Sequence, residues 1–476
     1  MSVQDSRPPA VQGGSTGAEV PRGRLAALRQ ALSALPRAAL GNLIAKLMMV
    51  GLGLAITVTV ARHGPQVQGA FALFVAVESA LLTLFTGLGL WLARQMSQQA
   101  DGQHGRALPM LQGVLRAAVA FGLLASLVLL GVSWWARAMP YTYLWLLALA
   151  APFLLLVPTA TGLWLGEGRM WPINVAQVSA PASVLVGLGG AWWITQGGQG
   201  SRSTVLLVLT AWVTGKSIVA VVTAFYALRH ARQRDERLED GFAGSRLTAF
   251  LQKPPSWVAQ WPFVATIGVT NVIGLLNYRV SLFLVERFDG LSTTGVYSVA
   301  VTAAELLWLL SSSVTVSVYS RIGHPDVKIA AAMTVQAVRI NVLSTLLAAP
   351  VLLGLAWWGL PWVMGPAYEA SLLPLAALLP GVAAYAAASS LSAFYTNHLG
   401  RPQLSGAIAG MSLTISFCVG WFLVPLWGPL GAGVASSTGY IVAIVAAYGV
   451  FLKHARLPVK ALWQPALTRV DGSASA

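Results

Sequence analysis

Five ionisable residues lie inside apolar stretches that are each long enough to cross a lipid bilayer. Three are cations and two are carboxylates: Lys46, Lys216, Arg279, Glu78 and Glu305. A charge at the bilayer centre costs about 2.5 to 3.5 kcal/mol on insertion scales, so a charged residue there is expected to serve function. Cations that face a wet cavity would bind a phosphate or diphosphate through charge-assisted hydrogen bonds. The excess of cations over carboxylates therefore favours an anionic substrate.

Each cation also has a structural interpretation. Lys46 and Arg279 lie about 9 Å from the nearer end of their predicted helices, so their side chains could extend to the nearer membrane surface instead. Lys216 lies near the middle of its helix, where the alternative is an ion pair with Glu78 or Glu305. If all three cations face inward, they form a ladder of positive charge across the membrane.

The two carboxylates need a partner or a cavity, because no polar residue of their own helices solvates them. They are interpreted as counter-ions to the cations, or as proton or sodium sites. Three polar side chains share helical faces inside the same stretches: Asn42 lies four residues before Lys46, and Asn271 and Tyr278 lie on one stripe of another helix. Such groups suit either sugar hydroxyls or hydrogen bonds between helices.

The composition requires lipid around most of the chain. Of 476 residues, 56% are hydrophobic and 9% are charged, against about 25% charged in soluble domains. Apolar stretches of roughly 20 residues, the length that spans about 30 Å of hydrocarbon, predict an all-α polytopic membrane protein with about 12 transmembrane helices. They fall near 40–61, 70–92, 111–134, 142–164, 173–195, 204–228, 261–285, 294–318, 338–360, 371–394, 403–425 and 429–452.

The positions of the basic residues predict the orientation. If both termini are cytoplasmic, 23 of the 30 lysines and arginines lie on the cytoplasmic side, 4 lie outside and 3 lie within the membrane. Cytoplasmic loops keep such an excess, which predicts a bacterial inner-membrane protein with both termini inside. The basic residues are thus explained by topology and by anionic membrane lipids, and no nucleic-acid partner is expected.

Similar motifs recur in the two parts of the chain at a nearly constant spacing. The corresponding residues are Gly69 and Gly295, Glu78 and Glu305, and Arg169 and Arg401. Two six-helix halves related by a pseudo-twofold axis along the membrane normal, with a substrate cavity between them, explain this pattern. The predicted organisation is a cytoplasmic N-terminal segment (1–37), a first half (38–228), a cytoplasmic connecting loop (229–260), a second half (261–452) and a cytoplasmic tail (453–476).

Several segments together resemble one transporter family. The run NYRVSLFLVE, the turn RFDGLSTTG and the following VYSVAVTAAELLWLL resemble the seventh and eighth helices of polysaccharide flippases. RHGPQVQGAFAL and GLGLWLARQM are similar to their first turn and second helix, and MGPAYEASLLPLAALLPG, HLGRPQL and VPLWGPLGAGVASS to their C-terminal third. In this order the matches cover most of residues 40 to 452. The family belongs to the multidrug, oligosaccharidyl-lipid and polysaccharide exporter superfamily.

The resemblance implies a flippase that moves a polyprenyl-diphosphate-linked oligosaccharide from the cytoplasmic to the periplasmic leaflet for surface-polysaccharide assembly. Its partners would be this lipid-linked substrate, membrane lipids, and the polysaccharide polymerase and chain-length proteins of the same pathway. Many relatives carry an aspartate where this chain has Ser281, so an ion-coupling role for that position is not expected here. The alternative is a multidrug or other small-molecule exporter of the same superfamily, for which an acidic cavity is expected.

An enzyme is not expected. The six histidines are scattered in loops or at helix ends, without metal-ligand spacing, so neither a metal site nor a cofactor is predicted. A glycosyltransferase or polymerase would need a large loop with catalytic carboxylates, and the longest loop, near 229–260, is too short for that. Transport by alternating access is therefore the leading hypothesis.

Overall fold

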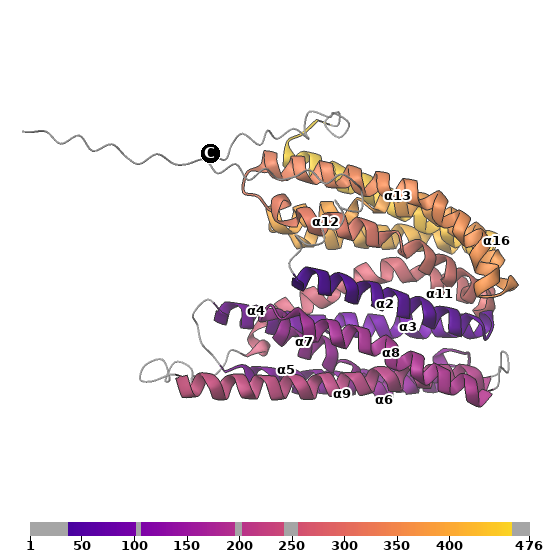
Figure 1. Cartoon of the computed structure of the whole chain (residues 1–476). Helices are drawn as coiled ribbons and strands as arrows, with labels where there is room; N and C mark the ends of the chain where they lie inside the picture. Colours follow the sequence, from indigo (N-terminus) through magenta and orange to yellow (C-terminus); the bar gives the residue numbers. More distant parts are fainter. Residues whose placement is uncertain (1–36, 101–105, 196–201, 242–255, 459–476) are drawn as a thin grey trace, which may run out of the picture.

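The computed structural model describes residues 37–100, 106–195, 202–241 and 256–458, and every regular element among them is helical (Figure 1). The first half contains α2 (Arg37–Ala61), α3 (Pro65–Leu84), α4 (Thr86–Ala100), α5 (Ala107–Trp135), the 3-10 turn η1 (Tyr141–Tyr143), α6 (Leu144–Leu154), α7 (Leu156–Gly166), α8 (Met170–Thr195) and α9 (Arg202–Gly241). The second half contains η2 (Trp257–Gln260), α11 (Trp261–Glu305), α12 (Trp308–Ile322), α13 (Val327–Val363), η3 (Pro366–Ser371), α14 (Leu372–Tyr385), α15 (Ala388–Ala393), η4 (Phe394–His398) and α16 (Pro402–Ala455).

Two of the longest helical stretches are hairpins. A straight helix of the length of α16, 54 residues, would extend about 80 Å, far beyond the roughly 30 Å of hydrocarbon in a bilayer. Its backbone leaves the helical region at Gly428, and Ser416 of one arm lies against Gly439 of the other. In α11 the backbone leaves the helical region at Gly290, and the two arms are joined by an ion pair between Arg279 and Glu305.

The all-α polytopic fold is confirmed. Ten stretches of the described residues are long and apolar enough to cross a membrane, and two of them contain these hairpins. The count of twelve spans is compatible with this arrangement and stays a prediction. Large apolar side chains that point outward from the helices, including Leu127, Val186, Leu355 and Phe422, cover the outer surface that lipid would contact.

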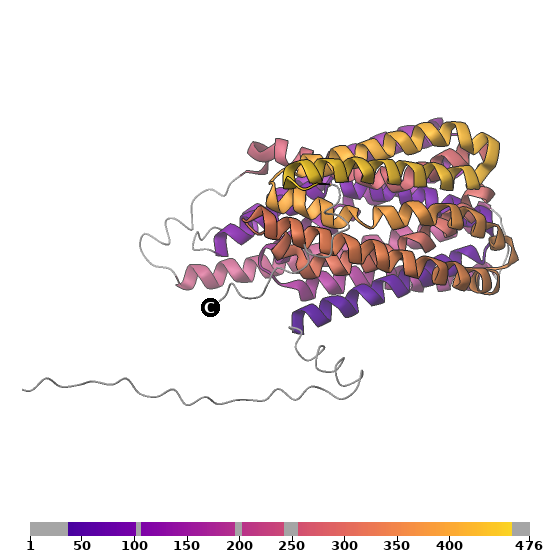
Figure 2. The same ribbon diagram turned by 90° about the horizontal axis from the view of Figure 1, so that it is seen from above.

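The halves occupy separate regions. In Figure 1 the indigo and magenta helices of the first half lie below the orange and yellow helices of the second, with α2, α3 and α11 between them. Figure 2, turned by 90°, shows that most helices run along a common direction. Buried apolar clusters largely follow this division: one includes Leu375, Phe394 and Phe451 of the second half, and two others lie mainly in the first half, although Leu73 of α3 joins the first cluster and Val264 of α11 joins one of the others.

Equivalent turns of the two halves are closed by glycines with positive φ, a conformation that other residues rarely adopt. Gly64 (φ 107°) corresponds to Gly290 (φ 81°), with the same spacing along the chain as the repeated motif glycines Gly69 and Gly295. Gly168 (φ 69°) and Gly400 (φ 62°) each directly precede one arginine of the repeated arginine pair. The backbone therefore supports the internal repeat independently of side-chain similarity.

The halves cross most closely where two equivalent glycines meet. A Cβ atom on Gly69 would lie 2.0 Å from the carbonyl oxygen of Leu291, and one on Gly295 would lie 1.9 Å from the carbonyl oxygen of Pro65. Pro65 and Leu291 each lie four residues before one of these glycines, so they are equivalent in the repeat. The contact is therefore reciprocal, as a twofold relation between similar surfaces requires. Helices α3 and α11 thus pack backbone against backbone at the end of the molecule predicted to be periplasmic.

The connection between the halves differs from the prediction. A loop was expected from residue 229, but α9 continues as a helix to Gly241. The continuation is anchored by the buried Asp235, whose carboxylate accepts hydrogen bonds of 2.9 Å from the backbone N–H groups of Ala107 and Leu108 at the start of α5. The expected loop is therefore partly a helical extension, and the N-terminal segment and most of the C-terminal tail lie outside the described residues.

The close packing of α3 against α11 predicts that one methyl group added at Gly295 pushes the two helices apart. Gly295→Ala should separate the halves, because its Cβ cannot fit beside the Pro65 carbonyl, whereas Gly354→Ala in α13 meets no atom within 4 Å. A cysteine introduced at the buried Val299, in a Cys418→Ser background, would report the separation through its rate of maleimide labelling. We expect at least a severalfold faster rate for Gly295→Ala only; equal rates in the two variants would contradict this packing.

Candidate functional site

A cavity of about 360 Å³ lies between the halves and contains the best candidate site. Helices α2, α3, α8 and α9 of the first half and α11 of the second contribute its lining, which includes Gln68, Trp212, Lys216, Arg279 and Ser298. We call it the central cavity. Its only ionisable lining residues among the described part of the chain are Lys216 and Arg279. Two of the three predicted cations therefore converge on one internal space.

Lys216 is held by the carboxylate of Glu78. Its Nζ lies 2.5 Å from Oε1 of Glu78, whose side chain is fully buried. The second carboxylate oxygen accepts a hydrogen bond from the indole Nε1 of Trp212, one turn before Lys216 on α9. The ammonium also lies 4.4 Å from the centroid of the same indole ring, a favourable cation–π position. Of the two carboxylates considered as partners of Lys216, Glu78 is the one that contacts it in the structure.

Arg279 forms the corresponding pair with Glu305. Its Nη1 lies 2.9 Å from Oε1 and its Nη2 lies 3.1 Å from Oε2. This two-bond geometry fixes the guanidinium plane as well as its position. Because Glu305 is the last residue of α11 and Arg279 lies on the other arm of the hairpin, the pair also holds the two arms together. Arg279 does not extend to a membrane surface in this arrangement.

The four charges are ordered with the cations toward the cavity. Lys216 and Arg279 line it, whereas neither carboxylate is among its lining residues. Lys216 lies about 20 Å along α9 from the first residue of that helix, and Arg279 lies about 16 Å before the Gly290 turn, so both are deep in their spans. A ligand in the cavity therefore meets positive charge first, with the neutralising carboxylates behind it.

The other predicted residues lie elsewhere. Lys46 is exposed on α2, one turn before Met49, and is not part of the cavity lining, so the three-cation ladder is not formed. Asn42 is half-buried one turn earlier on the same helix. Asn271 and Tyr278 line a different cavity in the second half, where the Asn271 amide donates a 3.2 Å hydrogen bond to Thr86 Oγ1. That contact matches the interhelical interpretation of Asn271.

The sequence analysis missed Gln68 and Ser298. Gln68 is 3% exposed, and its Nε2 donates a 3.1 Å hydrogen bond to Ser298 Oγ across the interface between the halves. Its Oε1 is buried without a hydrogen-bond partner among the described residues, although both residues line the central cavity. The available signal was a glutamine directly before Gly69 in an otherwise apolar run, which the search for charges passed over.

Polar bonds join the halves at the end predicted to be periplasmic. Arg62 Nε donates to the carbonyl of Val363 at 2.9 Å, and Tyr368 Oη donates to the carbonyl of Ala61 at 3.0 Å. Tyr141 Oη donates to Glu286 at 2.9 Å. Toward the other end, the cavity lining follows α2 from Thr57 to the exposed Met49. Cross-half contacts also lie nearer the opposite end, where the Asn271 amide bonds Thr86 and the backbones at Gly87 and Val264 pack together. The central cavity therefore lies between two sets of cross-half contacts.

Comparisons with known proteins identify the fold. No protein-family model matches the sequence, and no curated protein matches it. Among solved structures, an inward-facing multidrug resistance MATE family transporter of the MOP superfamily has a TM-score of 0.65 at 14% identity, covering 90% of this chain and 99% of that one. The lipid II flippase MurJ, in an inward closed conformation, has a TM-score of 0.65 at 12% identity, covering 90% and 89%.

A third structure is described by the charge of its pocket. It is a MOP superfamily transporter from Pyrococcus furiosus, reported under the words "reverse polarity of binding pocket", with a TM-score of 0.54, 14% identity and coverage of 90% and 96%. At these identities the similarity establishes the fold, that of MOP superfamily transporters. The positive charge of the central cavity is argued from Lys216 and Arg279 of this chain and not from these similar structures.

The buried pair at Glu78 predicts a non-additive pattern of stability. Glu78→Leu alone should destabilise the protein by about 3 to 5 kcal/mol, because it leaves Lys216 as an unpaired charge at membrane depth. Glu78→Leu combined with Lys216→Met should lose less than the single variant, since no charge is left unpaired. Thermal unfolding in detergent, followed by tryptophan fluorescence, measures this ordering. Glu236→Leu, which removes an exposed pair with Arg232, is the control and should cost under about 1 kcal/mol. A double variant less stable than Glu78→Leu alone would refute the pairing.

Proposed function

We propose that the protein is a flippase that moves a polyprenyl-diphosphate-linked oligosaccharide from the cytoplasmic to the periplasmic leaflet of the inner membrane by alternating access. The observation that carries the proposal is the order of charges in the central cavity, where Lys216 and Arg279 form the lining and their carboxylate partners lie outside it. A diphosphate is an anion that must pass through a layer of low dielectric constant. Cations that are already paired can hold it there without being exposed as bare charges in its absence.

The two cations differ in what they can do for a diphosphate. The guanidinium of Arg279 is planar, with donors that match phosphate oxygens two at a time, whereas the ammonium of Lys216 acts as a compact point charge. Both keep part of their side chain accessible, 26% for Arg279 and 22% for Lys216. A bound diphosphate would compete with Glu305 and Glu78 for the same N–H groups, so binding would loosen the pair that holds the arms of α11.

Contacts between the halves on either side of the central cavity are in line with alternating access. The cross-half bonds and the Gly69–Gly295 crossing join the halves at the end predicted to be periplasmic, and in this proposal the contacts nearer the cytoplasmic end open first to admit the substrate. Substrate would enter there and leave after the cross-half bonds break. The orientation with both termini cytoplasmic, and the link to a polysaccharide polymerase and chain-length proteins, belong to this proposal and follow from the charge count and the family resemblance.

A multidrug exporter is the alternative, and the fold shared with a multidrug resistance transporter favours it. A small cationic drug would need a negative cavity, whereas the ionisable residues that line the central cavity are both positive. The fold shared with a lipid II flippase is in line with a lipid-linked substrate. The charge of the cavity therefore favours the flippase over the exporter.

Arg279→Ala should abolish flipping, and Arg279→Lys should retain part of it, since lysine keeps the charge but loses the planar fork. Purified protein in liposomes with a fluorescent polyprenyl-diphosphate oligosaccharide would measure the rate at which substrate becomes accessible in the second leaflet. Arg287→Ala, an exposed arginine on the same helix outside the central cavity lining, serves as the matched control and should flip at the rate of the unmodified protein.

Two outcomes would argue against the flippase. Unchanged flipping by Arg279→Ala, at equal reconstitution, would remove Arg279 from the substrate path. Absence of flipping by the unmodified protein, together with accumulation of ethidium in the same liposomes, would favour the multidrug alternative.

A further inference from the structure

We propose that a second cavity, inside the second half, binds the uncharged sugar residues of the same substrate while the central cavity holds its diphosphate. The inference rests on the proposed function and divides the substrate between two sites of different chemistry. The second cavity has a volume of about 580 Å³ and is lined by α11, α12, α14, α15, η4 and α16, with Thr83 from α3. We call it the C-half cavity.

The lining of the C-half cavity is rich in hydroxyl groups and carries no formal charge. Ten of its 22 lining residues are serine, threonine or tyrosine, and none is aspartate, glutamate, lysine, arginine or histidine. A cationic drug would find no counter-ion there, and an anion would find no cation. A neutral ligand with many hydrogen-bonding groups fits this surface best, and its volume is in the range typical of small-molecule sites.

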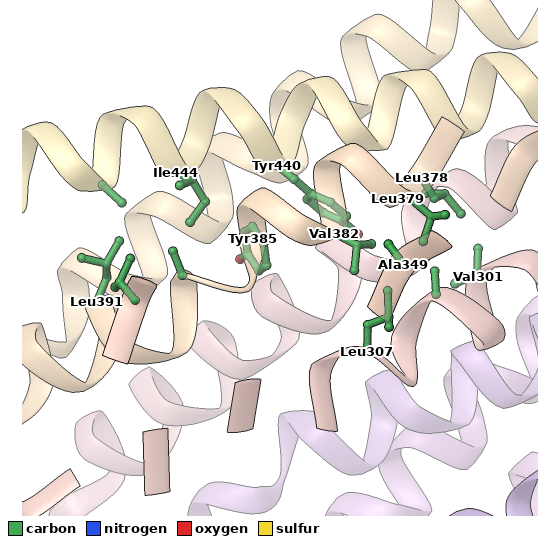
Figure 3. Close-up of a cluster of buried hydrophobic side chains, with 14 of the residues drawn as sticks. Val301, Leu307, Ala349, Leu378, Leu379, Val382, Tyr385, Leu391, Tyr440 and Ile444 are labelled. Carbon is green, nitrogen blue, oxygen red and sulfur yellow. The ribbon is translucent and has the colours of Figure 1, made fainter. Parts of the chain in front are cut away.

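Aromatic side chains form one wall. The ring centroids of Tyr278 and Trp308 are 4.5 Å apart, those of Tyr278 and Tyr385 are 6.0 Å apart, and all three residues line the cavity. The ring of Tyr440 lies 4.8 Å from that of Tyr385, and Figure 3 shows both side chains in the buried apolar cluster of the second half. The face of a sugar ring carries C–H groups that are attracted to the negative face of an aromatic ring. The wall therefore offers a stacking surface.

The hydroxyl groups are held in fixed positions with acceptor capacity to spare. Ser392 donates to Ser405 at 2.9 Å, and Tyr395 donates to the carbonyl of Ala447. A hydroxyl that donates its proton within the protein keeps lone pairs that can accept from a sugar hydroxyl. Conversely, Trp308 Nε1 is buried and has no acceptor among the described residues. A sugar oxygen would reach this donor only if the indole turned toward the C-half cavity.

The C-half cavity adjoins the central cavity along α11. Leu275 lines the former and Arg279, one helical turn later, lines the latter. On α3, Thr83 lines the C-half cavity and Val75, two turns earlier, lines the central cavity. Residues four apart on a helix face are about 6 Å from each other. A diphosphate held by Arg279 therefore places the first attached sugar within reach of Tyr278 and the C-half cavity.

The first half has no aromatic residue at the positions equivalent to Tyr278 and Trp308, and the equivalent of Tyr385, at the spacing of Arg169 and Arg401, is the exposed Phe153. The spacings that relate the repeated glycines and glutamates place Gly51 or Leu52 opposite Tyr278, and Leu81 or Leu82 opposite Trp308. Packing of a repeated fold explains neither Tyr278 and Trp308 nor the cluster of hydroxyl groups, because the other half is built without them. The asymmetry is expected if one half binds the sugars and the interface binds the phosphates.

The experiment separates the two parts of the ligand. Binding of two probes to the protein in lipid nanodiscs would be measured by calorimetry: farnesyl diphosphate, and farnesyl diphosphate that carries one neutral hexose, tested with glucose, galactose and mannose. At least one hexose should raise the affinity of the unmodified protein roughly three- to tenfold, the contribution of one aromatic contact with associated hydrogen bonds. Trp308→Leu should remove this increment and leave the affinity for farnesyl diphosphate unchanged.

Two further variants guard against misfolding. In the double variant Ser392→Ala with Ser405→Ala, both partners of one hydrogen bond are removed at once, so no buried group is left unpaired, and the sugar increment should again decrease. Trp358→Leu, on the exposed face of α13, is the matched control and should keep it. If no hexose adds affinity, or if the increment survives Trp308→Leu, the sugar site is refuted while the flippase stands. If neither probe binds, the proposed function itself fails.

Discussion

The cost of holding a charge in a medium of low dielectric constant governs this structure. Lys216 and Arg279 persist deep in the membrane-spanning helices only because Glu78 and Glu305 neutralise them. Trp212 completes the first pair with a hydrogen bond and its ring, and the second pair has two N–H···O contacts. The orientation of each pair, with its cation toward the central cavity, is the basis of the function that we propose. With the carboxylates outside the lining, the cavity presents positive charge to a ligand and remains neutral in total when empty.

The architecture presents this charge at the interface between the two halves. Each cation pairs with a carboxylate of its own half, so neither ion pair ties the halves together. The cross-half contacts are instead neutral or peripheral, such as Gln68 with Ser298 and the backbone crossing at Gly69 and Gly295. Separation of the halves at that end would break these contacts without exposing an unpaired buried charge. Such a division of roles suits the alternating access that we propose, in which the halves change their relative orientation in every cycle.

Much of this arrangement follows from the sequence. Hydropathy and length indicated the helical membrane fold, and the spacings of the repeated motifs agree with those between the positive-φ glycines of equivalent turns. Two converging cations and their two carboxylate partners were also indicated by their positions in apolar runs. The exposed Lys46 was indistinguishable from them, because helical periodicity in a uniformly apolar span does not show which face meets the protein and which meets lipid.

The pairing of the charges was beyond reach of the sequence. Glu78 and Glu305 are equivalent in the repeat, yet their partners are not: the positions that correspond to Arg279 and Lys216 in the other half, near Gly53 and within residues 442–448, hold no charge. Only the packing of helices shows that one carboxylate pairs with a neighbouring hairpin arm and the other with α9. The C-half cavity was likewise hidden, because its hydroxyl residues are spread over several helical elements.

Native mass spectrometry of the protein released directly from its own cell membrane tests the central claim most directly. If the central cavity holds a lipid-linked diphosphate, a fraction of the protein should carry a bound species whose fragments include a polyprenyl diphosphate, and this species should be absent from Lys216→Met combined with Glu78→Leu. Protein that carries only phospholipid, identical in the unmodified and double-variant samples, would contradict the account.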